Sequence, residues 1–122
     1  MIDDPNLGLL QKMLDAASLR HRVVANNIAN VNTPGYQRRV VHFREQLAQA
    51  IAGGDTARIA ELRPEIQVSS AGPTRPDGNN VTLERELADL MKNALMYKTC
   101  TQLLSARIAS YRAAITGHSM RA

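Results

Sequence analysis

The sequence predicts a mainly all-α protein, an elongated antiparallel coiled-coil pair of N- and C-terminal helices with a short, largely irregular middle segment. Three observations predict this class. The chain of 122 residues carries two long apolar seams with alternating spacings of three and four, one near each end. Aromatic residues make up only 3%, so aliphatic side chains must supply the buried surface, as helices allow. Between the seams, Gly and Pro interrupt any regular pattern.

The N-terminal helix is predicted between a cap at Asn6 and a stop near residues 30–32. Its apolar stripe recurs at helical spacing and is interrupted by a single histidine, His21. A lone histidine on such a stripe is more often a packed or rim residue than a ligand, so we predict no metal site there. The seam residues predicted for this helix are Leu10, Leu14, Val24 and Ile28.

The stretch ANNIANVNTPGY, residues 25–36, turns the helical pattern into a cluster of asparagines. Asn is a poor residue for a helix interior because its short amide competes for backbone hydrogen bonds, so the cluster marks a helix end. Asn26, Asn27 and Asn30 share a helix face, which suits polar contact with another chain. A solvated helix terminus is the plain alternative.

A turn, a connector and a short helix are predicted next. Pro34 before Gly35 favours a type II turn, because Pro fixes φ and Gly accepts a positive φ. Residues 37–41 hold two Arg and two adjacent Val, which fits an extended connector better than a helix. The short amphipathic helix after it ends at a Gly-Gly pair. Its apolar face is formed by Phe43, Leu47, Ala50 and Ile51.

The rest of the middle segment is predicted to be largely irregular. Residues 55–62 suggest a short helical turn, and residues 65–69 alternate like a brief strand. Residues 70–80 collect Pro, Gly, Asn and Asp, the composition of a solvated loop. The predicted ranges are 1–36 for the N-terminal helix and its turn, 37–81 for a connector with a short helix and a flexible loop, and 82–122 for a long C-terminal helix. The helices of the first and last ranges are expected to form one domain.

The C-terminal helix has the more regular seam. Thr82 is the expected N-cap, and Gly117 is the expected stop. Glu84 and Glu86 lie in the first turn, where carboxylates favour the helix dipole. Further apolar residues lie off the seam, so we expect neighbouring chains to cover them and to complete the fold. The predicted seam residues are Leu87, Leu90, Tyr97, Leu104, Ile108 and Tyr111.

Several classes of function are disfavoured by the residue inventory. The net charge of +4 comes from scattered basic residues without interleaved aromatics, which argues against nucleic-acid binding. The three histidines are dispersed, and Cys100 is alone, so we predict no enzyme, metal, cofactor or small-molecule substrate. The N-terminus lacks the pattern of a cleavable signal peptide, and no segment is apolar enough to span a membrane.

The stretch ANNIANVNTPGY resembles the N-terminal signature shared by the bacterial flagellar basal-body rod, hook and hook-associated proteins. The passage EREL…KNALMYKT is similar to the start of the C-terminal helix in the small proximal-rod members of that family. The signature residues that carry the resemblance are Asn26, Asn27, Ile28, Asn30, Asn32, Pro34, Gly35 and Tyr36. A soluble coiled-coil adaptor is the alternative that the signature disfavours, and another small rod protein is the alternative within the family.

The resemblance implies a structural subunit of the proximal rod, which assembles helically, transmits torque and leaves a central export channel. It implies other copies, other rod proteins, the rod adaptor protein and the membrane-ring protein as partners. It also implies passage through the type III export gate without a cleaved signal, and a final place in the periplasmic rod. Phe43 and Leu47 form the FxxxL pattern that resembles the motif read by the gate, although any amphipathic helix supplies such a pair.

Overall fold

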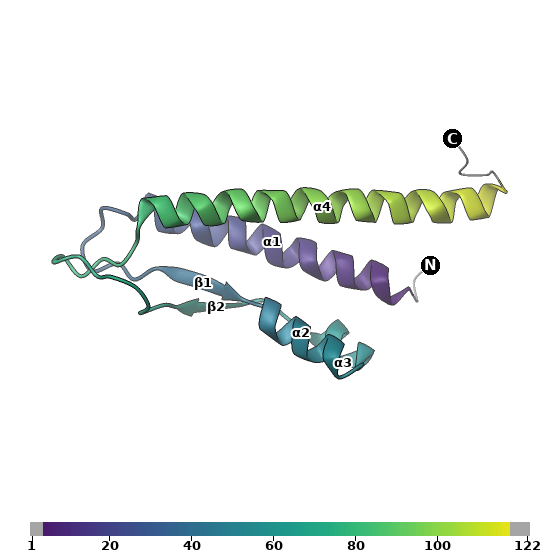
Figure 1. Cartoon of the computed structure of the whole chain (residues 1–122), viewed down its shortest axis with the longest axis horizontal. Helices are drawn as coiled ribbons and strands as arrows, with labels where there is room; N and C mark the ends of the chain where they lie inside the picture. Colours follow the sequence, from purple (N-terminus) through teal and green to yellow (C-terminus); the bar gives the residue numbers. More distant parts are fainter. Residues whose placement is uncertain (1–3, 118–122) are drawn as a thin grey trace.

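The computed structural model describes residues 4–117 as three layers, with the N-terminal helix in the middle (Figure 1). The ends of the predicted ranges, residues 1–3 and 118–122, lie outside the described residues. The elements are α1 at Pro5–Ala29, β1 at Arg39–His42, α2 at Arg44–Ala52, α3 at Thr56–Glu61, β2 at Glu65–Val68 and α4 at Leu83–Thr116. α4 lies along one side of α1, and the elements of the middle segment lie along the other. The predicted class, a mainly helical and elongated molecule, is confirmed.

The N-cap of helix α1 lies two residues earlier than predicted. Asp4 is the N-cap, and its carboxylate accepts a hydrogen bond of 2.9 Å from the backbone N–H of Asn6. Pro5 follows at the first helical position, where a backbone N–H has no acceptor within the helix, so the missing N–H of proline costs no hydrogen bond. The prediction of Asn6 as the cap is therefore wrong, because a better acceptor precedes the proline.

The helix α4 has 34 residues and is about 51 Å long at 1.5 Å per residue, whereas α1 has 25 residues. Thr82 occupies the N-cap position as predicted, but its side chain makes no capping hydrogen bond. Gly117 ends the helix in the left-handed conformation with φ of 73°, as predicted. The two helices run antiparallel, because Asn27 near the end of α1 bonds to Glu86 at the start of α4. None of the helices within residues 4–117 has the length and hydropathy needed to cross a bilayer.

The middle segment folds against the face of α1 that α4 leaves free. β1 and β2 pair antiparallel, with Arg39 opposite Val68 and His42 opposite Glu65. The predicted helix at residues 55–62 is observed as α3, and the predicted strand as β2. Phe43 and Leu47 pack on Ala16 of α1 to form the core, surrounded by Leu9, Met13, Val41, Ile59 and Leu62. Ile51 is 51% exposed, so the prediction that it belongs to the buried face of its helix is wrong.

Residues 70–80 form neither helix nor strand, as predicted, but the far end of this loop is not solvated. Asn79 and Asn80 are at most 3% exposed, and Val81 after them is 1% exposed. The prediction of a solvated loop was wrong at this end because asparagine occurs both in solvated loops and as a buried hydrogen-bonding residue. Composition alone does not distinguish these two environments.

Candidate functional site

Five buried polar residues meet where the end of α1, the start of β1 and the start of α4 come together. They come from three separate parts of the chain and are at most 4% exposed. We call this cluster the polar junction; its members are Asn27, Arg38, Asn79, Asn80 and Glu86. Among the described residues, no buried side-chain nitrogen or oxygen lacks a hydrogen-bond partner. The junction is thus a closed network, and such networks specify one arrangement of the chain around them.

Asn27 uses its whole amide to join α1 to β1 and α4. Its Nδ2 donates to the backbone oxygen of Arg39 at 2.8 Å, and its Oδ1 accepts from the Arg39 N–H at 2.9 Å. The side chain therefore pairs with the outer edge of β1 as a neighbouring strand would. The same Nδ2 donates to Glu86, and Oδ1 also accepts from the Tyr36 hydroxyl. In the single chain the Asn27 amide is used by partners of the same chain, and its part in assembly stays a prediction.

Arg38 and Glu86 form an ion pair in which both partners are buried. The Arg38 Nε lies 2.8 Å from Glu86 Oε1, and the second carboxylate oxygen accepts from Asn27 at 3.2 Å. Arg38 Nη2 also lies 3.4 Å from Asp89 Oδ2 at the edge of the site. Glu86 was predicted to sit in the first turn for its dipole effect; the structure gives its carboxylate two specific partners. Removing Arg38 would leave the Glu86 carboxylate buried without an ion-pair partner, whereas removing Glu86 would leave Arg38 only its longer contact with Asp89.

Asn79 closes the C-terminal end of α1, which has no glycine cap. Its Nδ2 lies within 3.2 Å of the backbone oxygens of Asn30, Val31 and Thr33. These carbonyls follow the last helical turn and have no partner within the helix. Asn80 adds a second link between the two segments, because its Oδ1 accepts a hydrogen bond of 2.6 Å from the backbone N–H of Arg38. The loop before α4 is therefore tied to the signature segment by its side chains.

The predicted turn at residues 33–36 is confirmed. Gly35 has φ of 75°, and the Tyr36 N–H donates to the Thr33 oxygen at 3.2 Å. The loop that precedes α4 reaches this turn as well, because the Gly35 N–H donates to the Asp77 oxygen at 2.8 Å. A methyl group added at Gly78 would lie 3.4 Å from the Gly35 Cα. Two glycines with positive φ thus pack closely where the turn meets the loop.

Gly35→Val should lower the free energy of unfolding by about 1–2 kcal/mol, because the turn holds this residue in the left-handed region. An added Cβ meets no heavy atom within 4 Å, so the effect comes from the backbone conformation and not from a clash. Gly35→Asn is the matched control, since Asn tolerates this conformation better. Urea unfolding followed by circular dichroism measures both; equal stability of the two variants would contradict the strained-turn explanation.

The signature residues divide into an inner and an outer set. Asn27 is buried, and Ile28, Asn30 and Tyr36 are half-buried. The exposed members are Asn26, Asn32, Pro34 and Gly35. Asn30 bonds back to the Asn26 oxygen at 2.8 Å and so closes the helix end locally. The assembly role of the set stays a prediction.

The predicted seam residues are not equally covered in the single chain. Val24 is buried, and the half-buried members are Leu10, Leu14, Ile28, Leu90, Leu104 and Tyr111. The exposed members are Leu87, Tyr97 and Ile108, at 44%, 47% and 40%. The residues that α4 buries are Glu86, Asn93 and Cys100, none of which is a predicted seam residue. An assembly can bury what one chain leaves exposed, so the seam as a whole stays a prediction.

At the other end of the helix pair, Asp4 joins the start of α1 to α4. Its carboxylate accepts from the Tyr111 hydroxyl and lies 3.1 Å from Arg107 Nε. The hydrogen bond from Tyr111, with the charge of Arg107, holds the pKa of Asp4 below its usual value. The same bond raises the pKa of Tyr111. Asp4 therefore caps α1 and also links the start of α1 to α4.

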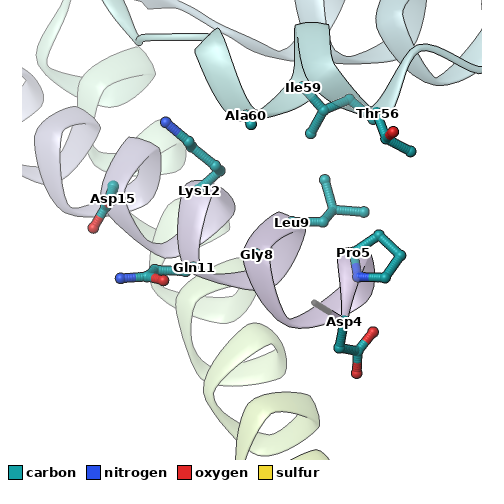
Figure 2. Close-up of a pocket in the computed structure, with 10 residues that line it drawn as sticks. All are labelled: Asp4, Pro5, Gly8, Leu9, Gln11, Lys12, Asp15, Thr56, Ile59 and Ala60. Carbon is teal, nitrogen blue, oxygen red and sulfur yellow. The ribbon is translucent and has the colours of Figure 1, made fainter. Parts of the chain in front are cut away.

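A cavity with a volume of about 600 Å³ lies between the N-terminal part of α1 and α3 (Figure 2). Leu9 and Ile59 face each other across it. The Lys12 amine beside them donates to the Leu62 oxygen at 3.0 Å. Asp4 is engaged as described above, so both of these charged groups serve the fold. We assign it no chemistry.

Three of the five junction residues were not recognised from the sequence, and Glu86 was recognised only as a carboxylate in the first turn of its helix. Arg38 appeared only as part of an extended connector, and Asn79 and Asn80 as loop composition. Burial of polar side chains depends on partners far along the chain, and hydrophobic periodicity carries no signal for it. The only available signal was the run of two asparagines immediately before a helix, which is common at solvated ends too.

Comparison of the sequence with known proteins finds similarity to flagellar components. A family model described as flagella basal body rod protein matches residues 14–37, which include the whole signature segment. The chain is 30% identical over 125 residues to the flagellar basal body rod protein FlgB of Aeromonas hydrophila, covering 93% of this chain and 95% of the relative. It is 33% identical over 121 residues to the protein of that name from Cereibacter sphaeroides, covering 91% and 94%. The Bacillus subtilis (strain 168) relative is 25% identical over 122 residues.

Proposed function

The chain belongs to the family of flagellar basal body rod proteins that includes FlgB, and from this premise we propose how its surface serves the rod. It is a structural component of the flagellar basal body, and it assembles with other rod components. We propose that it packs in a helical array in the proximal rod, transmits torque and helps to enclose the export channel. The observation that carries the proposal is the similarity over nearly the whole chain, signature segment included.

The surface proposed for packing is a row of apolar side chains on α4, spaced four residues apart. We call it the outer stripe; it consists of Leu83, Leu87, Met91 and Leu95. All four are more than 40% exposed in the single chain, and Met91 reaches 70%. Residues four apart lie on one helix face, so the row is continuous. A continuous apolar face on a subunit of an assembly is expected to be covered by a neighbouring subunit.

The partners proposed for these surfaces are further copies of the chain, other rod proteins, the rod adaptor protein and the membrane-ring protein. Contacts in a helical array are heterologous and do not close on themselves. The grouping of the helices of residues 1–36 and 82–122 into one domain is part of the same proposal. It is supported by the antiparallel contact of α1 with α4, the most extensive contact between elements.

Complementation tests the proposal. A flagellated strain without its own gene for this protein should swim again when the chain is expressed, and purified basal bodies should contain it. Detection of the chain only in the cytoplasm or in the outer filament would contradict a place in the rod.

We propose further that Phe43 and Leu47 are read by the export gate while the chain is unfolded, before it reaches the periplasmic rod without a cleaved signal. In the folded chain the two side chains are 4% and 8% exposed and pack on Ala16. A receptor therefore has little access to them after folding. In the folded chain the same two residues are part of the hydrophobic core. Their role in export and their role in stability therefore require separate tests.

Phe43→Ala with Leu47→Ala should keep the protein in the cytoplasm, because the gate loses both apolar contacts. The matched control is Leu9→Ala with Met13→Ala, which weakens the same core from α1 without touching the motif. Immunoblots of cytoplasmic and basal-body fractions compare the two. If both double variants are retained equally, the defect is due to lost stability and not to the motif. If the motif variant is exported normally, the proposed contact of Phe43 and Leu47 with the gate is wrong.

A further inference from the structure

The face of α4 that α1 covers repeats every seven residues but carries different chemistry at each repeat. Positions 86, 93, 100 and 107 hold Glu, Asn, Cys and Arg. Glu86 bonds to Asn27 and Arg38, and Arg107 pairs with Asp4. These contacts lie at opposite ends of the helix pair, so each helix end has a partner that fits only one alignment.

Asn93 supplies the contact in the middle. It is 5% exposed, and its Nδ2 donates to the backbone oxygen of Ala17 at 2.7 Å. Arg20 donates to its Oδ1 at 3.5 Å. A buried amide needs partners at a fixed distance, so this contact also depends on the alignment of α1 with α4.

The apolar positions beside this face are, by contrast, nearly equivalent to one another. Leucine or tyrosine recurs every seven residues at Leu83, Leu90, Tyr97, Leu104 and Tyr111. If α4 slipped by one repeat, or about 10 Å at 1.5 Å per residue, each of these side chains would be replaced by another large side chain, leucine or tyrosine. Apolar packing alone therefore distinguishes poorly between the native alignment and a slipped one.

The polar contacts do distinguish the two alignments. After such a slip, Asn93 or solvent would take the place of Glu86, and Arg38 would be left as an unpaired buried charge. A single polar residue in a helix seam is known to fix register and orientation at some loss of stability. The slip would also move the outer stripe about 10 Å relative to the signature turn, and it would break the hydrogen bonds by which Asn79 and Asn80 hold the start of α4 at that turn.

We infer that Arg38 and Glu86 are positioning residues that set the axial register of α1 against α4, with Asn93 and Asp4–Arg107 as secondary determinants. The ion pair thereby fixes the distance between the signature turn and the outer stripe, the two features that neighbouring subunits must meet together. The role in assembly rests on the proposed rod function. The register itself is a property of the single chain and is tested separately.

The test measures register by pulsed electron paramagnetic resonance between spin labels at Ser18 and Gln102, both exposed, in a Cys100→Ala background. The otherwise unchanged chain should give one narrow distance distribution. Arg38→Met with Glu86→Leu replaces both charges by apolar groups, so helical content should persist. A second population, displaced by up to about 10 Å, should appear. Arg39→Met with Glu84→Leu makes the same changes at exposed neighbouring positions and should keep the single distribution.

A single narrow distribution in the Arg38→Met, Glu86→Leu variant would overturn the inference, because the register would then hold without the ion pair. A broad distribution in the otherwise unchanged chain would overturn it too, since the polar contacts would not hold one register. Swimming provides the separate readout of rod function. If the proposed function fails, the parent chain does not restore swimming although its distance distribution stays narrow.

Discussion

Arg38→Met on its own should lower the free energy of unfolding by about 3–5 kcal/mol, because it leaves the Glu86 carboxylate buried without its ion-pair partner. Glu86 is 0% exposed, so water cannot replace the guanidinium without opening the junction. Asn27 would remain as a donor to the carboxylate, but a neutral amide compensates only part of a buried charge. Urea unfolding monitored by circular dichroism measures the change.

The matched control for this prediction is Arg39→Met, the same substitution at the neighbouring and exposed position. It should change stability by no more than about 0.5 kcal/mol. Adding Glu86→Leu to Arg38→Met should recover much of the lost stability, since the unpaired charge is then removed as well. A loss below about 1 kcal/mol for Arg38→Met alone would mean that the buried ion pair is not the main interaction of the junction.

The helical part of the fold was predictable because its signals are local. Alternating spacings of three and four located both long helices, and Gly117 and Gly35 marked the stop and the turn where a positive φ is required. The glycine pair after Ala52 likewise ended α2 where predicted. Each of these signals depends on a few adjacent residues, so no knowledge of the tertiary structure was needed.

The polar junction was not predictable in the same way, because its members lie far apart in the chain. Asn27 and Glu86 are 59 positions apart, and each alone has the pattern of an ordinary helix terminus. The pairing of β1 with β2 was missed for the same reason, since the partner of a strand depends on nonlocal contacts. The buried residues of α4 differ from its predicted seam residues because two of them, Glu86 and Asn93, are polar, and an apolar pattern cannot reveal buried polar positions.

Met91→Glu with Leu95→Glu should abolish swimming while leaving the isolated chain nearly as stable as the wild type. The two side chains are 70% and 67% exposed, and Glu is about as good a helix former as Met or Leu. The expected change in unfolding free energy is therefore within about 1 kcal/mol. In the rod the same positions would place two carboxylates in an apolar contact, which costs several kcal/mol per subunit unless they are paired. Swim-plate assays and urea unfolding measure the two effects.

This contrast separates the outer stripe from the polar junction, because the junction variants act on the single chain and the stripe variant acts on the contact between chains. Ala48→Glu with Gln49→Glu on α2 adds two acids at exposed positions away from the stripe and controls for the change in charge. That control should swim. If the stripe variant also swims, the outer stripe faces solvent in the rod and the proposed packing surface is wrong. If its isolated chain unfolds, the stripe already contributes to the fold of one subunit.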